Sequence, residues 1–97
     1  MITVQVRGGR GDVVLSSECR LDWVDLRHVD ENEFPCLGSL LPYADTIFNE
    51  RQVIRVRREL ESQRIRELLG VDTAVEIERL CLAVEGGLHR YLWFLGD

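Results

Sequence analysis

The chain has 97 residues, 45% of them hydrophobic and 30% charged, and its formal net charge is −5. A chain of this length folds around one core, so we predict a single domain over residues 1–97. The composition excludes disordered and collagen-like proteins, and the apolar run at residues 91–95 is far too short to span a membrane.

The basic residues and the cysteines indicate a cellular environment. All twelve basic residues are arginine, which is typical of GC-rich coding sequences, so we expect a bacterial source and a cytoplasmic location. Cys19, Cys36 and Cys81 are odd in number and too widely spaced for a CxxC pair. Neither His28 nor His89 has zinc-finger spacing from a cysteine. We therefore predict buried free thiols, no metal and no cofactor.

The N-terminal residues predict a β-hairpin. Apolar and polar side chains alternate over residues 2–7, glycines within residues 8–11 supply a turn, and residues 13–15 form a return strand. The glycines and arginines of the turn could also suggest a phosphate loop. Such a loop needs a following helix and normally a lysine, whereas a strand follows here, so the hairpin turn is the better interpretation.

The stretch after the hairpin fits two interpretations. A helix that starts at Ser16 or Ser17 would carry Leu21 and Val24 on one side. Residues 21–26 also alternate well enough for a strand. We favour the helix.

The same stretch is the most acidic part of the chain and contains a tryptophan. Aromatic residues ringed by charge are typical of interaction hot spots, and a negative field speeds the encounter with a basic partner. We therefore predict a partner-binding region made of Asp22, Trp23, Asp25, Asp30, Glu31 and Glu33. The alternative is a plain acidic loop with a tryptophan in the core.

Residues 49–70 predict a helix followed by a shorter one. Asn49 and Gln52 have the spacing of a capping box. One narrow arc of the first helix is apolar and faces the core: Val53, Val56 and Leu60. Two pairs of opposite charge are spaced to interact on its exposed side: Arg55–Glu59 and Arg57–Glu61. Beyond Glu61 the apolar residues no longer fall on the same side of the helix. We therefore expect a break at residues 62–63 and a short helix that continues to Gly70.

The C-terminal third predicts one more helix and a strand. Thr73 and Glu76 have the spacing of a capping box, and Gly86 ends the helix. Its core-facing side is Ala74, Ile77, Leu80, Cys81 and Val84. Val75 and Leu82 lie on the opposite side, where another element or a partner would cover them.

Residues 88–95 are aromatic and apolar, which suits a strand buried on both faces. This strand would pair with the N-terminal hairpin. We therefore predict an α+β fold: a small antiparallel sheet of the hairpin plus the C-terminal strand, packed against two or three helices.

Residues 42–49 crowd a proline, two aromatic residues and several polar residues ahead of a helix. They offer a structural hub or an alternative site made of Tyr43, Asp45, Thr46, Asn49 and His89. As a site, these side chains would supply acid–base or nucleophilic groups. As a hub, Asp45 and Thr46 would bond free backbone donors, while Tyr43 and Phe48 would fill core space. No nucleophile elbow, histidine-rich helix or paired-carboxylate spacing is present, so we favour the hub and predict no catalytic residue.

Three parts of the chain resemble a family of small uncharacterised bacterial proteins: residues 34–37, residues 42–49 with Gln52, Glu59 and Leu60, and the ending at residues 89–97. Its members share a Pro-Tyr-Gly-Asp-Thr-hydrophobic-Phe-Asn segment and close with His-x-Tyr-Leu-x-Phe-x-Gly-Asp. The resemblance implies no activity. Leu41 stands where aspartate is common, and Ala44 stands where glycine is common.

These observations favour a non-catalytic protein-binding domain, of the kind that acts as an immunity protein or antitoxin against a basic toxin. The alternative is a small enzyme or ligand-binding domain centred on Asp45, Thr46, Asn49 and His89. Arginines within residues 51–58 could follow a phosphate backbone, but the net charge of −5 opposes nucleic acid. The oligomeric state stays open, including a homo-oligomer.

Overall fold

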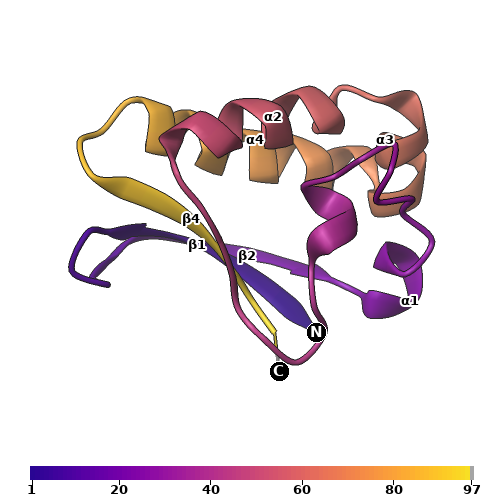
Figure 1. Ribbon diagram of the computed structural model, residues 1–97, viewed down its shortest axis with the longest axis horizontal. Coiled ribbons are helices and arrows are strands. Elements are labelled where there is room, and N and C mark those ends of the chain that lie inside the picture. Colours follow the sequence, from indigo (N-terminus) through magenta and orange to yellow (C-terminus); the bar gives the residue numbers. More distant parts are fainter. Residues whose placement is uncertain (97) are drawn as a thin grey trace.

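The computed structural model describes residues 1–96, which form a four-stranded antiparallel sheet with helices packed on one of its faces (Figure 1). The sheet order is β2-β1-β4-β3. The strands are β1 (Ile2–Gly8), β2 (Val13–Leu21), β3 (Thr46–Phe48) and β4 (Arg90–Leu95). The helices are α1 (Trp23–Leu26), α2 (Glu50–Leu60), α3 (Gln63–Leu69) and α4 (Val71–Glu85), with a 3₁₀ turn η1 (Leu37–Ser39). The predicted α+β fold, with its N-terminal hairpin and C-terminal strand, is confirmed.

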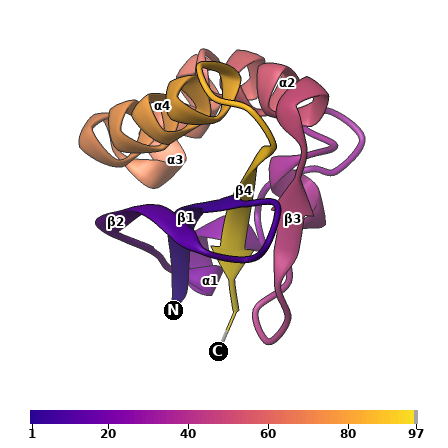
Figure 2. The ribbon, with the colours of Figure 1, turned by 90° about the vertical axis from the view of Figure 1, so that its left-hand side faces the viewer.

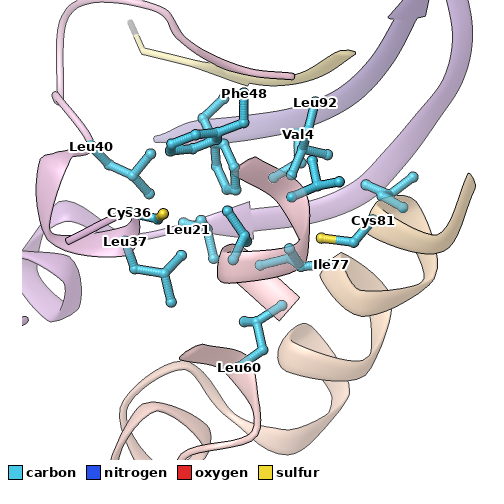
Figure 3. Packing of buried hydrophobic residues seen from close by; sticks show 14 of the residues in the cluster. Val4, Leu21, Cys36, Leu37, Leu40, Phe48, Leu60, Ile77, Cys81 and Leu92 are labelled. Carbon is cyan, nitrogen blue, oxygen red and sulfur yellow. The ribbon is translucent and has the colours of Figure 1, made fainter. Parts of the chain in front are cut away.

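The two central strands bring the chain's beginning and end together. β1 pairs with β4 in a register that sets Val4 opposite Phe94 and Val6 opposite Leu92. Because side chains alternate across a strand, these four side chains point to one face, and all four are buried there. Figure 3 shows this face of the sheet meeting the apolar sides of the helices.

β4 is buried on one face only, so the prediction of burial on both faces is wrong. Tyr91, Trp93 and Leu95 are only partly buried. Figure 2 shows α2, α3 and α4 together on one side of the sheet, so within residues 1–96 no second layer covers these residues. The guanidinium of Arg7 lies 4.3 Å from the centroid of the Trp93 ring on this open face. Leu88 precedes the strand and is 87% exposed.

The sheet has a fourth strand that the sequence pattern did not predict. β3 pairs with β4, with Thr46 opposite Phe94 and Phe48 opposite Leu92. Phe48 is buried and meets Phe94 edge to face, with 5.7 Å between ring centroids. Three residues are too few to show the alternation by which a strand is recognised in a sequence.

The predicted helix from Ser16 or Ser17 is also wrong. β2 continues to Leu21, which pairs with Ile2 of β1, and the helix covers only Trp23–Leu26. Residues 23–26 do not form the alternative strand either. Asp22 begins the helix, because its side chain accepts a hydrogen bond from the Val24 amide at 2.9 Å.

α2 begins as predicted and pairs its charges differently. The capping box is present: the Asn49 side chain accepts from the Gln52 amide, and the Gln52 side chain accepts from the Asn49 amide. The predicted pairs Arg55–Glu59 and Arg57–Glu61 are replaced by tertiary contacts. Arg57 bonds Glu85 of α4 at 2.8 Å. Glu59 accepts hydrogen bonds from the backbone amides of Cys36 and Leu37.

The break after α2 and the core-facing side of α4 are as predicted. Gly70, with φ of 89°, separates α3 from α4, and α4 therefore begins at Val71. Thr73 lies inside the helix and does not cap it. Val75 and Leu82 are half exposed. Among residues 1–96, no helix combines the length and the apolar character needed to cross a bilayer.

Candidate functional site

The two predicted candidate regions meet at one end of the molecule. A hollow of about 150 Å³ is lined by Met1, Ile2, Asp22, Trp23, Pro42 and Tyr43. Asp22 and Trp23 come from the start of α1, whereas Pro42 and Tyr43 come from the turn that leads to β3. Figure 1 shows α1, the N-terminus and this turn at the same end of the sheet. We call the hollow and its lining the aromatic end.

Both aromatic side chains of this end face solvent. Tyr43 is 84% exposed and Trp23 is 37% exposed. The interpretations that place Tyr43 in the core, and Trp23 in the core, are therefore wrong. Val24 and Leu41 beside them are half exposed. Apolar side chains in this position are not needed to fill the core, which lies on the helical side of the sheet.

Buried anchors fix the segments that carry these side chains. Leu26 anchors α1, and Leu37 and Leu40 anchor the η1 segment that precedes the turn. Glu59 of α2 holds the start of η1 by accepting the Cys36 and Leu37 amides at 2.9 and 2.8 Å. The turn therefore leaves the core at a fixed point and presents Tyr43 outward.

The far side of the turn rests on the end of the chain. A Cβ on Gly96 would lie 2.6 Å from the backbone nitrogen and oxygen of Ala44 and 2.9 Å from the Leu41 oxygen. Only glycine lets the two backbones approach so closely. The turn is thus supported by backbone packing.

All six residues of the predicted partner-binding region are exposed, but three of the carboxylates also have structural roles. Asp22 caps α1, and Asp30 accepts a hydrogen bond from the Asn32 amide at 2.9 Å. Glu33 bonds Arg64 at 2.9 Å in an exposed ion pair, which weakens its outward field. Asp25 and Glu31 have no side-chain partner among the residues that the structure describes.

The hub interpretation of residues 42–49 is correct for one half of the segment and wrong for the other. Asn49 caps α2, and Phe48 fills the core. Asp45 and Thr46 do not bond the free donors before the helix, because Asn49 takes the Arg51 and Gln52 amides itself. Within residues 1–96, neither Asp45 nor Thr46 has a side-chain hydrogen bond.

The residues of the alternative site do not converge. Asn49 and His89 line one hollow of about 280 Å³. Asp45 precedes β3, where Thr46 pairs with Phe94, five residues beyond His89. Five residues of strand span roughly 17 Å, whereas proton transfer needs a heavy-atom distance of about 3 Å. Asp45 and His89 therefore do not form an acid–base pair. Across the described residues, no group of three or more His, Cys, Asp or Glu side chains is placed to hold a metal ion.

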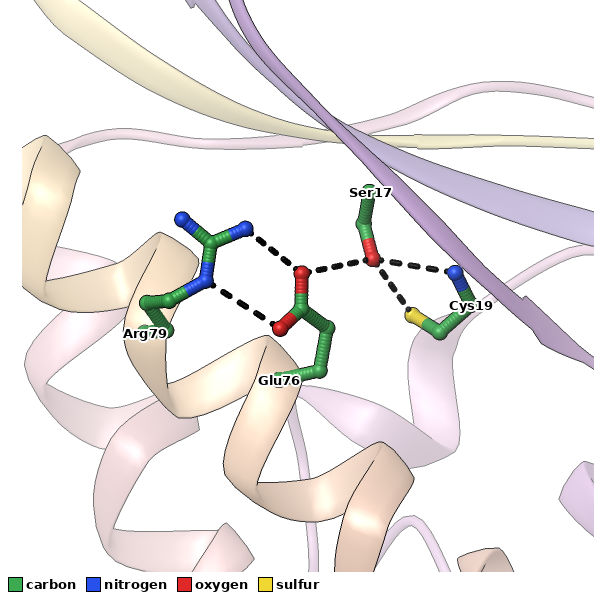
Figure 4. Close-up of polar contacts among 4 residues, drawn as sticks. All are labelled: Ser17, Cys19, Glu76 and Arg79. Atoms are coloured by element: carbon green, nitrogen blue, oxygen red, sulfur yellow. Dashed lines mark hydrogen bonds and ion pairs between the residues drawn. The ribbon is translucent and has the colours of Figure 1, made fainter.

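A polar cluster that the sequence pattern did not reveal joins β2 to α4. The Ser17 hydroxyl contacts Oε1 of Glu76 at 3.1 Å and accepts the Cys19 amide at 3.1 Å (Figure 4). Arg79 holds both oxygens of Glu76, the shorter contact being 2.6 Å. The cluster lies where the β1–β2 register shifts, between Thr3 and Gln5. The Ser17 hydroxyl therefore supplies an acceptor for the Cys19 amide at this irregularity of the ladder.

The pKa shifts in this cluster and at the three cysteines oppose nucleophilic chemistry. Its hydrogen bond to Arg79 lowers the pKa of Glu76, which makes Glu76 a poor base for activating Ser17. Burial raises the pKa of Cys19, and it raises the pKa of Cys36 to about 11 and of Cys81 to about 12. Thiols with such pKa values are protonated near neutral pH and are weak nucleophiles.

No family model matches the chain, and no curated protein or solved structure matches it either. The family resemblance thus stays a prediction. Its two segments lie side by side in the fold, because residues 46–48 and 90–95 are the adjacent strands β3 and β4. The last residue of the resembling ending, Asp97, lies outside the described residues.

Proposed function

We propose that the chain is a non-catalytic protein-binding domain and that the aromatic end is its interface. One observation supports this most strongly. Trp23 and Tyr43 are twenty residues apart in the sequence, yet both are exposed at the rim of one hollow. Tryptophan and tyrosine are the residue types most enriched at the energetic centres of protein interfaces.

The surroundings of the two aromatic residues fit an interface as well. Met1, Val24 and Leu41 add half-exposed apolar surface next to them. A patch of exposed apolar side chains with charged residues around it is typical of a protein interaction site. Here the rim is acidic, because Asp22 caps α1 and Asp25 lies in its first turn.

The acidic rim and the net charge of −5 select a basic partner. A small protein that covers a basic surface of a second protein acts by occlusion and needs no chemistry of its own. An immunity or antitoxin-type inhibitor of a basic toxin in the bacterial cytoplasm is such a protein, and we propose this role. The enzymatic alternative has no comparable support, because Asp45 and His89 lie near opposite ends of β4.

Affinity capture tests the proposal. The immobilised protein is exposed to lysate of the organism that encodes it, and bound proteins are quantified by mass spectrometry. We expect a basic protein that the Trp23→Ala/Tyr43→Ala double variant retains at least thirtyfold less well, since hot-spot side chains contribute about 2 kcal/mol or more each.

Leu88→Ala is the matched control. It truncates another strongly exposed apolar residue, outside the lining of the aromatic end, and should leave capture unchanged. The measured affinity of the purified partner then gives the loss for each variant. Equal binding by the double variant and the wild type would contradict the proposal.

A further inference from the structure

We infer that the hollow of the aromatic end receives one arginine side chain of the basic partner. This inference rests on the proposed protein-binding function and specifies what its central contact is. It follows from the shape of the hollow, the residues of its wall and the charge at its rim.

The hollow has the size and wall of a site for one flat group. A volume of about 150 Å³ is that of a cavity that accommodates a benzene-sized molecule, so one planar guanidinium with part of its aliphatic stem fits. Trp23 and Tyr43 supply aromatic surface, and Ile2, Met1 and Pro42 supply apolar surface for the stem. Arginine combines a weakly hydrated planar cation with such a stem.

The Asp22 carboxylate provides a negative charge at the rim of the hollow, where it can contact a bound guanidinium. Asp22 lines the hollow, and only its Oδ1 is engaged within the fold, by the Val24 amide. Among the residues that the structure describes, its Oδ2 has no hydrogen-bond partner and can accept an N–H of a guanidinium. Asp22 is the only charged side chain of the lining, and Met1, whose α-amino group is a cation, has a partner of its own in the fold.

A contact between an arginine and an aromatic ring is already present elsewhere in the chain. Arg7 lies over the Trp93 ring at 4.3 Å from the centroid on the open face of the sheet. A cation within about 6 Å of an aromatic centroid is attracted by the negative face of the ring. An aliphatic side chain would fill the hollow without using Asp22, and an acidic one would be repelled by it.

The experiment is an NMR titration of the 15N-labelled protein with the peptide N-acetyl-Gly-Arg-Gly-amide. We expect saturable shifts of the Trp23 indole N–H and the Tyr43 amide. The peptide with citrulline in place of arginine has nearly the same shape and no charge, and we expect it to bind at least fivefold more weakly. Equal binding of the two peptides, or shifts confined to other surfaces, would overturn the inference.

Two variants separate the charge from the ring. Asp22→Asn keeps a good cap for α1 and removes only the charge, so arginine-peptide affinity should fall at least threefold. Tyr43→Leu keeps apolar surface and removes the ring face, and it should weaken the arginine peptide about threefold while sparing the citrulline peptide. Glu18→Gln removes an exposed carboxylate of β2, outside both the lining and the acidic rim, and should change neither.

The two proposals fail in different ways. If the captured partner is lost with the Trp23→Ala/Tyr43→Ala variant while the arginine and citrulline peptides bind alike, protein binding stands and the arginine inference is wrong. If the arginine peptide binds selectively but capture of every protein is unaffected by the double variant, the site binds arginine and the proposed protein interface is wrong.

Discussion

Residues 41–49 divide into two halves that the fold treats in opposite ways. The ladder half, residues 46–49, pairs with β4, buries Phe48 against Phe94 and caps α2 with Asn49. The turn half, residues 41–45, exposes Tyr43 and leaves the Asp45 side chain without a partner in residues 1–96. The side chains of the ladder half serve the stability of the fold, whereas stability does not account for the exposed side chains of the turn half.

This difference locates function within a segment that looks uniform in the sequence. Each half contains an aromatic residue and at least one polar residue, so composition alone cannot separate packing from recognition. The separation comes from where each side chain points once β3 joins the sheet. Changes in the ladder half should therefore act on folding, and changes in the turn half should act on binding.

The largest expected effect is that of Phe48→Ala. Removing a buried aromatic side chain that packs on Phe94 should lower the free energy of unfolding by about 3–5 kcal/mol, measured by urea denaturation. Tyr43→Ala is the matched change in the turn half, and we expect it to stay within about 0.5 kcal/mol of the wild type. Comparable losses for the two variants would break the contrast between the halves.

A smaller effect is expected at the support of the turn half. Gly96→Ala places a methyl group against the backbone of Ala44 and Leu41, so the turn has to move. Overpacking of this kind should cost about 1–3 kcal/mol of unfolding free energy. Gly9→Ala serves as the control, because its Cβ would meet its nearest neighbour at 3.6 Å, an ordinary contact. A stable Gly96→Ala variant would show that the turn half is not fixed by this contact.

The cap of α2 offers a finer comparison. Asn49→Ala removes the side-chain acceptor of the Arg51 and Gln52 amides and should cost about 1 kcal/mol in urea denaturation. Asp45→Ala in the turn half removes a side chain without a hydrogen bond and should cost only a few tenths of that value. Asn49→Ser should restore most of the lost stability. A large loss of unfolding free energy in Asp45→Ala would show that Asp45 has the predicted structural role after all.

The sequence predicted those parts of the fold that have long periodic patterns or paired caps. α2 was recognisable from Asn49, Gln52 and an apolar arc, and β1 was recognisable from strict alternation. β3 was missed because three residues show no period, and the extent of β2 was missed because small polar residues such as Ser17 suggested a cap instead of a strand interior.

The candidate site was predictable residue by residue and not as an assembly. The sequence marks both Trp23 and Tyr43 as candidates, but in different roles. Their meeting depends on long-range contacts, namely the Glu59 hydrogen bonds to η1 and the approach of Gly96 to Ala44. No local pattern encodes such contacts. Asp22 illustrates the same limit, because its capping role appears only once the end of β2 is known.

The smallest effect concerns pH and uses Glu76, a carboxylate that the fold does engage. Its hydrogen bond to Arg79 lowers its pKa from the ordinary value of 4.5, so the folded state holds the ionised form more strongly than the unfolded state. The resulting stability is present above pH 4.5 and is lost as the pH falls through the lower, folded-state pKa.

Arg79→Gln removes the main cause of this shift and should flatten the decline in the urea midpoint between pH 5 and pH 3. The change should be smaller than that of any variant above, because the ion pair is partly exposed and screened by water. An unchanged slope would show that the cluster adds nothing to acid stability.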